Sequence, residues 1–526
     1  MKRIFIAASL ALFSFAASAQ RNTLLEQSFW RTQPNAEAVK AEVAKGSNPS
    51  ELNRQAMDPV VIAINTGAPN ETIKYLLEQP GNDVNKITHD GRIYLHWATA
   101  KGNIEIMQLL IDKGSKASMV DAHGTTPLNF AAGNGLTPEV IDLCVKAGAN
   151  LKKDVNQDGA NVLLLAVAGD KDLAITNYLV SKGLDIKSVD KNGNNIFGYA
   201  ARSGNVNLLK ALAQKGITPN DNAIVVASQG GRRGTTLSLE FFEYLESLGI
   251  KPTATTKAGE NVLHFLVRRP NQKEIIEHFL SKGVNVNQAD EEGNTPFMFA
   301  AASNRDLATL GLLASKVSNI NQTNSKGESA LSLAVKGNSP EVVKFLIEKG
   351  ADVNVANKDG ENLLAYLVQS YNAGGFGGPG APGGQGGPQG GAPQGAPQGG
   401  GEGRGGFGAK TEDFDAKLKM LEEKGLKATT SQKNGNTLYH LAVMKNDLGL
   451  LKHIQALGID VNAKNSEGIT ALHKAAMIAK DDTVMKYLVS VGAKKEAVTN
   501  FNETAFDLAS ENESLSKSKI SITFLK

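Results

Sequence analysis

Five arginines are the residues of this 526-residue chain best suited to holding a charged partner. Arg202, Arg268 and Arg269 each follow an apolar helical stretch, and Arg232 and Arg233 lie in the glycine-rich segment between those stretches. A guanidinium donates paired hydrogen bonds to a carboxylate or a phosphate. We therefore predict that these arginines hold an acidic segment of a protein partner. The alternative is a solvated face neutralised by nearby carboxylates, those of Glu240, Glu243 and Glu260.

Neither the cysteine nor the remaining motifs predict catalysis. The single cysteine, Cys144, lies in an apolar helical stretch, which favours packing over a reactive thiol and excludes a disulfide framework. His89 and His123 precede turn glycines by different offsets, which argues against a shared metal site. The match to G-x-G-x-x-G at residues 375–380 has no strand before it and no helix after it. An enzyme would need a site in the 227–238 connection, which lacks paired carboxylates, a nucleophile with a base, and metal ligands. We expect no enzyme, no cofactor and no metal.

The overall charge of the chain also restricts its partners. The formal net charge is only +3, charged residues make up 21% of the chain and aromatic residues 6%. This balance argues against bulk electrostatic binding to nucleic acid or to a membrane surface. A protein partner remains the favoured class.

The element that positions these residues is a repeat, seen most clearly in the segment 324–357. Gly327 marks a tight turn, and a short apolar helix is predicted after it. Ser339 and Pro340 predict the start of a second helix, as N-cap and first helical residue, and Gly350 predicts its end. Two helices this short cannot cover each other's apolar faces, so each unit must stack on neighbouring units.

The same unit recurs along most of the chain. The small or apolar residue near the end of each first helix recurs from Ala63 to Ala509, mostly at intervals of 33 to 35 residues. The two intervals flanking Ala227 are irregular but together equal two repeats, which indicates a long connection and not a domain break. The interval from Leu367 to Ala442 contains one repeat plus an insertion.

These units resemble ankyrin repeats. The resemblance rests on GTTPLNFAAGNG at 124–135, GNTPFMFAAA at 293–302, GITALHKAA at 468–476 and GADVNVAN at 350–357. It covers roughly residues 55 to 510. The resemblance implies an all-α repeat solenoid, in which stacked ankyrin-type helix-turn-helix units are joined by short β-turn or hairpin loops.

The resemblance also suggests roles for particular side chains. In the family, a histidine in the first helix ties adjacent turns together by hydrogen bonds, a position held here by His96, His264, His440 and His473. Successive copies would lie about 8–10 Å apart, which is too far to share a metal ion. The register of the arginines resembles that of the family's binding groove. We expect the aromatic residues next to the histidine register to pack in the core, the alternative being a ligand-stacking ladder: Trp97, Phe130, Tyr199, Phe265, Phe299 and Tyr366.

The composition predicts how the chain is divided. Lys2 and Arg3, the apolar stretch that follows and the small residues before Gln20 predict a signal peptide of bacterial type, cleaved between Ala19 and Gln20. The Gly/Pro/Gln-rich insert cannot bury enough apolar surface to order itself and is predicted to be a passive tether, the alternative being a partner-binding arm. The predicted parts are a signal peptide at 1–19, a divergent capping repeat at 20–57, an ankyrin array at 58–372, the insert at 373–409, further ankyrin repeats at 410–510 and a polar tail at 511–526.

The predicted function is that of a non-enzymatic scaffold that holds a protein partner outside the cytoplasm, most simply in the periplasm. Binding would use the concave surface of the solenoid and the variable residues at its turn tips. The partner carries an acidic segment in this prediction; nucleic acid, a transmembrane anchor and a small-molecule cofactor are not expected. The alternative is a secreted effector or toxin that acts on a host or competitor protein.

Overall fold

The computed structural model describes residues 22–230, 237–371 and 411–526. The predicted cleavage site at Ala19 and Gln20, the arginines Arg232 and Arg233 and the insert at 373–409 lie outside the described residues. The chain divides into two compact units, Met1–Thr218 and Pro219–Lys526, and each is described by itself.

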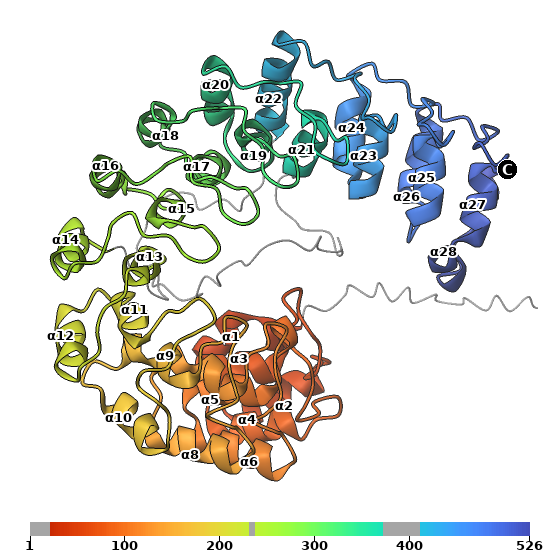
Figure 1. The fold of residues 1–526 in the computed structure, drawn as a ribbon. Helices are drawn as coiled ribbons and strands as arrows, with labels where there is room; N and C mark the ends of the chain where they lie inside the picture. The colour runs from red at the N-terminus through yellow and green to blue at the C-terminus, as the bar shows by residue number, and fades with distance from the viewer. Residues whose placement is uncertain (1–21, 231–236, 372–410) are drawn as a thin grey trace, which may run out of the picture. The chain divides into compact units, whose positions relative to one another are not determined.

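The first unit consists of short helices packed in pairs (Figure 1). The first helices of successive repeats pack against one another, as α3 does on α5 and α5 on α7. Its α-helices are α1 (Gln27–Arg31), α2 (Ala36–Ala44), α3 (Pro59–Thr66), α4 (Asn70–Leu77), α5 (Tyr94–Lys101), α6 (Ile104–Asp112), α7 (Pro127–Ala131), α8 (Pro138–Lys146), α9 (Val162–Ala166), α10 (Ala174–Ser181), α11 (Ile196–Ala201) and α12 (Val206–Gln214).

The second unit repeats the same arrangement, with a row of first helices and a row of second helices (Figure 1). Its helices are α13 (Asn222–Ser228), α14 (Leu239–Ser247), α15 (Val262–Leu266), α16 (Lys273–Ser281), α17 (Pro296–Ser303), α18 (Leu307–Ala314), α19 (Ala330–Gly337), α20 (Pro340–Glu348), α21 (Leu363–Ser370), α22 (Thr411–Glu423), α23 (Leu438–Lys445), α24 (Leu448–Gln455), α25 (Ala471–Ile478), α26 (Thr483–Ser490), α27 (Ala505–Glu511) and α28 (Glu513–Lys517).

These elements confirm the predicted all-α repeat fold. Within the described ranges there is no extended strand, only isolated bridges inside the hairpin loops, such as that between Thr323 and Ser329. None of the helices in these ranges is long and apolar enough to cross a membrane.

The repeat at 324–357 shows how local sequence sets the element boundaries. Gly327 and Gly350 have φ angles of 80° and 89°, a region that glycine enters without steric cost. Pro340 is the first residue of α20, as predicted. Ser339 occupies the N-cap position but its hydroxyl makes no capping bond; it bonds the carboxylate of Glu341 and thereby lowers the pKa of that carboxyl.

Asparagine side chains tie neighbouring repeats together at the ends of the first helices. Asn304 Nδ2 donates to the carbonyl oxygen of Val267 at 2.8 Å, and Asn338 Nδ2 donates to that of Ala301 at 2.8 Å. The last carbonyls of a helix have no partner within their own helix. These bonds therefore satisfy groups that stacking would otherwise bury without a partner.

Both described ends of the chain fold back onto the repeats. Trp30 is fully buried and its Nε1 donates to the carbonyl oxygen of Leu24 at 2.8 Å. In the segment predicted as a polar tail, α28 and a final turn at Thr523–Leu525 bury Leu515 and Leu525. These apolar side chains cover the last repeat.

The two sides of the insert meet in one aromatic cluster. The ring of Tyr371, 3% exposed, lies 5.5 Å from that of Phe414 and stacks on His453 at 6.0 Å, measured between centroids. Lys445 Nζ donates to the carbonyl oxygen of Val368 at 2.8 Å and also to that of Tyr371. The repeat is therefore closed by its own side chains on both sides of the insert.

We expect deletion of residues 375–408 to leave the melting temperature within about 2 °C of the full chain. The five residues that remain between Tyr371 and Thr411 reach up to about 17 Å, and closure entropy changes slowly with loop length. Differential scanning calorimetry measures the effect. Tyr371→Ala in the full chain is the comparison, because truncating a buried aromatic side chain costs about 3–5 kcal/mol. A deletion as harmful as Tyr371→Ala would contradict the passive role predicted for the insert.

Candidate partner-binding surface

The histidine register joins each repeat to the next. In α23, His440 Nδ1 lies 3.1 Å from the backbone N–H of Thr437, which it accepts, and Nε2 lies 2.9 Å from the carbonyl oxygen of Ile469 in the following hairpin. His473 repeats this geometry toward Ala497 at 2.9 Å, and His96 toward Thr125 at 3.0 Å. Because Nδ1 accepts, Nε2 must carry the proton. These contacts give the histidines the tying role that the resemblance implies.

The same histidines are held neutral by burial. Loss of solvation lowers the pKa of His96, His440 and His473, and lowers that of His264 to about 4. His264 Nδ1 accepts from the backbone N–H of Asn261 at 3.0 Å, but its Nε2 has no hydrogen-bond partner among the described residues. His264 is therefore the least satisfied member of the register.

The aromatic register is bonded to the hairpins by its polar members. Trp97 Nε1 donates to Thr88 Oγ1 at 3.0 Å, and Tyr199 Oη donates to Asp190 Oδ2 at 2.8 Å, each nine residues upstream. The phenylalanines of this register have no such polar atom, and Phe130, Phe265 and Phe299 are partly exposed. The register thus packs as predicted where it is polar and leaves ring surface accessible where it is phenylalanine.

An arginine that the sequence reasoning missed covers one of these rings. The Arg92 guanidinium lies 4.3 Å from the Phe130 centroid, and its Nε donates to Asp121 Oδ2 at 3.0 Å. Its Nη1 also donates to Asp90 at 3.1 Å. Arg92 directly follows the turn glycine and so stands before its helix, outside the register searched for arginines. The available signal was an arginine placed one repeat before a hairpin aspartate.

Arg268 makes the corresponding contact in the second unit. Its guanidinium lies 3.6 Å from the centroid of Phe299 in the next repeat and 5.9 Å from that of Phe265. Burial lowers the pKa of Arg268, and the charges of Glu260 and Asp290 oppose that shift. No ion pair within 4 Å joins Arg268 to another described residue, and the side chain is exposed. The edge of this guanidinium is therefore directed to an acceptor that the described residues do not supply.

The other predicted arginines are engaged within the fold. Arg269 Nη2 donates to the carbonyl oxygen of Gln229, in the preceding repeat, so it points away from its neighbour Arg268. Arg202 is the C-cap residue of α11 and is half-buried beside Tyr199 and Asp158. Arg202 belongs to the first unit and the other two to the second. The structure does not bring the predicted set together within one unit.

The structure also shows where the cysteine and the hairpin histidines lie. Cys144 is fully buried in α8, and burial raises the pKa of its thiol to about 12, so it packs as a neutral group. His89 Nε2 and His123 Nε2 lie 3.2 and 3.6 Å from Asp90 Oδ2. Over the described ranges, no group of three or more histidine, cysteine or carboxylate side chains is arranged to hold a metal ion.

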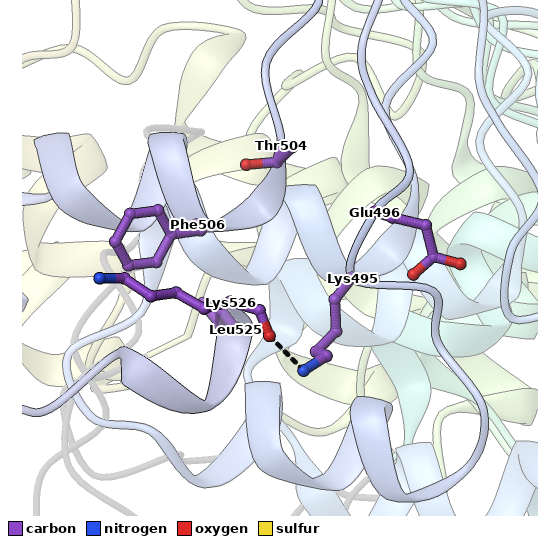
Figure 2. Close-up of a pocket in the computed structure, with 6 residues that line it drawn as sticks. All are labelled: Lys495, Glu496, Thr504, Phe506, Leu525 and Lys526. Atoms are coloured by element: carbon purple, nitrogen blue, oxygen red, sulfur yellow. Dashed lines mark hydrogen bonds between the residues drawn. The ribbon is translucent and has the colours of Figure 1, made fainter.

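The pockets of the described chain are open and shallow in chemistry. Figure 2 shows one of about 410 Å³ at the C-terminal end, where Lys495 Nζ donates to the carbonyl oxygen of Lys526. The Lys526 ammonium lies 4.9 Å from the centroid of the Phe506 ring. The polar groups of this pocket are bonded to one another and do not converge on an empty point. Its lining consists of Lys495, Glu496, Thr504, Phe506, Leu525 and Lys526.

Stacked helix pairs, hairpins in phase and contact residues spread over many repeats define an α-helical repeat scaffold. Such scaffolds typically bind protein over an extended surface and carry no catalytic centre. The model of the family described as ankyrin repeats matches residues 32–121, 60–154, 128–223, 263–357, 300–374 and 420–520. The chain therefore belongs to the ankyrin repeat family, as its motifs indicated.

Relatives of known name share the repeats but are longer proteins. The chain is 27% identical over 283 residues to the ankyrin repeat and KH domain-containing protein mask-1 of Caenorhabditis elegans, covering 52% of this chain and 10% of that protein. It is 25% identical over 403 residues to transient receptor potential cation channel subfamily A member 1 of Homo sapiens, covering 60% and 35%. Among solved structures, the ankyrin repeat domain of Bcl-3 is 19% identical with a TM-score of 0.33, over 50% of this chain and 100% of that one. The chain thus spans a third or less of these two relatives' length.

Proposed function

We propose that the chain is a non-enzymatic scaffold that holds a protein partner outside the cytoplasm, with Arg268 contacting an acidic segment of that partner. Arg268 carries this proposal, because its guanidinium is exposed, stacked at 3.6 Å on Phe299 and without an ion pair among the described residues. A stacked guanidinium keeps its N–H groups directed outward in the ring plane, ready for a carboxylate.

The hairpin tips and first helices around Arg268 extend the proposed surface over several repeats. Glu291 and Glu292, Ser325 and Lys326 are exposed at the tips of the next two hairpins. The hairpins are joined by backbone bonds, as from Glu291 N–H to the carbonyl oxygen of Ala258 at 2.7 Å. A rigid row of tips loses little conformational freedom on binding, which supports complementarity over many repeats as the source of affinity.

Export is supported by the N-terminal sequence. Lys2 and Arg3, the apolar stretch and the cleavage pattern at Ala19 and Gln20 are typical of a signal peptide, which would place the mature chain in the periplasm or outside the cell. Fractionation of the producing cells, with immunoblotting of the processed chain, measures this. Recovery of an uncleaved chain from the cytoplasm would contradict export, and recovery only from the culture medium would favour the effector alternative.

We expect Arg268→Glu to lower capture of the partner at least tenfold while leaving the fold intact. Immobilised wild type and variant are exposed to extracts of the producing cells, and bound proteins are quantified by mass spectrometry. Arg305→Glu is the matched control, because it makes the same charge change on an exposed arginine one repeat further on. A protein retained by wild type and Arg305→Glu but lost by Arg268→Glu is the expected result. Equal recovery by all three would rule out the acidic-segment contact.

A further inference from the structure

Five exposed aliphatic side chains stand at one position of consecutive hairpins in the first unit. Each immediately precedes the residue whose backbone N–H closes the hairpin turn, as Val120 precedes Asp121, which donates to Thr125 at 3.0 Å. Their exposed fractions run from 37% to 57%. We call this set the aliphatic column: Leu52, Ile87, Val120, Val155 and Val189.

The hairpins that carry the column are in contact from one to the next. His89 Nδ1 lies 2.9 Å from the carbonyl oxygen of Gln55, and the backbone N–H of Ala122 donates to Asp90 at 2.8 Å. Further along, the backbone N–H of Lys191 donates to Asp158 at 2.8 Å. These bonds fix the tips relative to one another, so the column is a rigid row with one aliphatic side chain per repeat.

Hairpin geometry alone does not explain aliphatic residues at this position. A β-branched side chain favours the extended backbone, but threonine does so as well without exposing apolar surface. The second unit uses mostly small or polar residues at the same position: Thr255, Ala289, Thr323, Ala356, Ser431, Lys464 and Val498, of which Val498 is half-buried. Single exposed aliphatic residues are ordinary, but a row in phase over five repeats marks a surface that becomes covered.

We propose that the aliphatic column is the contact surface between two copies of this chain, related by a two-fold axis at Val120. A two-fold contact pairs residue i of one copy with residue j of the other and j with i. The column is evenly spaced, at 33 to 35 residues per step, with two members on each side of Val120. An antiparallel pairing therefore places Val120 against itself, Ile87 against Val155 and Leu52 against Val189.

Charge and area are both consistent with a second copy as the occupant. Between residues 22 and 218 the 20 lysines and arginines equal the 20 aspartates and glutamates, so two first units do not repel each other. Four steps of 8–10 Å and a hairpin width of about 11 Å give roughly 800 Å² over both copies. That area corresponds to a weak dimer, with a Kd of about 10 µM or weaker. The inference is independent of the partner contact proposed at Arg268, which lies in the other unit.

A cysteine at the two-fold axis tests the pairing directly. The only native cysteine, Cys144, is fully buried, so Val120→Cys gives the full-length chain one accessible thiol. A disulfide needs Cβ atoms about 3.5–4.5 Å apart, which only residues close to the axis can meet. With diamide as the oxidant, which accepts the two electrons and two protons released by the paired thiols, Val120→Cys is expected to cross-link at least tenfold faster than Val145→Cys. Val145 is the control because it is 41% exposed but lies on the outer side of the first unit, in α8.

Off-axis positions sharpen the test. Val189→Cys is expected to cross-link with Leu52→Cys in a mixture of the two proteins but not with itself. Equal rates for Val120→Cys and Val145→Cys, or self-linking by Val189→Cys, would overturn the two-fold pairing. Circular dichroism confirms that each exposed substitution leaves the fold unchanged.

Sedimentation equilibrium of the native chain provides the second measurement. Triple substitution to threonine at Ile87, Val120 and Val155 is expected to weaken dimerisation at least tenfold, whereas Val145→Thr with Val180→Thr leaves it unchanged. A wild type that stays monomeric at ~100 µM would overturn the proposal. Loss of a co-purifying foreign protein from the triple variant, with a monomeric wild type, would assign the column to another partner and likewise overturn it.

Discussion

Lowering the pH from 7.5 to 4.5 is expected to destabilise the repeat stack through its buried histidines. Their folded-state pKa lies below the ordinary value near 6.5, at about 4 for His264. Above pH 6.5 both the folded and the unfolded states are neutral at this residue. Below it the unfolded state binds a proton that the folded state does not, so the free energy of unfolding falls until the pH reaches the folded pKa. For His264 alone the loss approaches about 3 kcal/mol by pH 4.

The physical cause is the way each ring is used. Nδ1 already accepts a backbone N–H, so protonating it would set two donors against each other inside the stack. His96, His440 and His473 would in addition disturb the bond that reaches the next hairpin. Because each repeat is held mainly by its neighbours, weakening several of these bonds together acts on the whole array.

Urea denaturation followed by circular dichroism at pH 7.5, 6.0, 5.0 and 4.5 measures the effect. His264→Asn keeps an acceptor for the N-cap N–H but does not titrate, so its loss of stability over this range should be smaller by about 2 kcal/mol. His123→Asn removes an exposed histidine from a hairpin tip and should leave the slope of the wild type. Carboxylates titrate equally in all three proteins and cancel in the comparison. An unchanged slope in His264→Asn would contradict the role assigned to burial.

Replacing Lys417 by methionine is expected to stabilise the second unit at pH 7 by about 1–2 kcal/mol. Lys417 is 1% exposed, and its Nζ has one printed acceptor, the carbonyl oxygen of Val335 at 2.9 Å. Burial lowers the pKa of the ammonium to about 8, against an ordinary 10.5. At pH 7 the folded state therefore bears a cost of about 3 kcal/mol for the buried charge. Methionine removes that cost and forfeits one hydrogen bond worth about 1–2 kcal/mol.

The pH dependence separates this explanation from simple repacking. Between pH 8 and 10.5 the folded wild type has lost the proton that the unfolded chain still holds, so its free energy of unfolding rises with pH. Lys417→Met should show no such rise, and its advantage should disappear near pH 10.5. Lys419→Met, on the exposed side of the same helix, is the control. A Lys417→Met protein that is less stable than wild type at pH 7 would show that the bond to Val335 outweighs the buried charge.

Both predictions concern the bonds between repeats, and these bonds also bear on binding. A surface spread over many repeats keeps its shape only while each hairpin is held against the next. The acidic-segment contact at Arg268 depends on Phe299 of the following repeat, which Arg268 covers. Acid conditions that loosen the histidine bonds should therefore weaken partner capture before the chain unfolds.

The sequence by itself determined the repeat, the helix boundaries and the family. These features depend on residues close together in the chain: a turn glycine such as Gly327, a proline such as Pro340 and an apolar spacing of one helix turn. Local preferences act within a few residues, so they can be read without knowing the neighbours. Repetition then confirmed each reading many times over.

Only the tertiary structure decided what the functional side chains contact. Arg268 and Arg269 are adjacent in sequence, yet one lies on the following repeat and the other bonds the preceding one. Lys417 is polar in sequence but buried, because its helix packs where only a backbone carbonyl can accept its proton. Arg92 and the aliphatic column became visible only once hairpins about 34 residues apart in the chain lay side by side. Side-chain direction and exposure depend on atoms contributed by other repeats, and no local pattern records them.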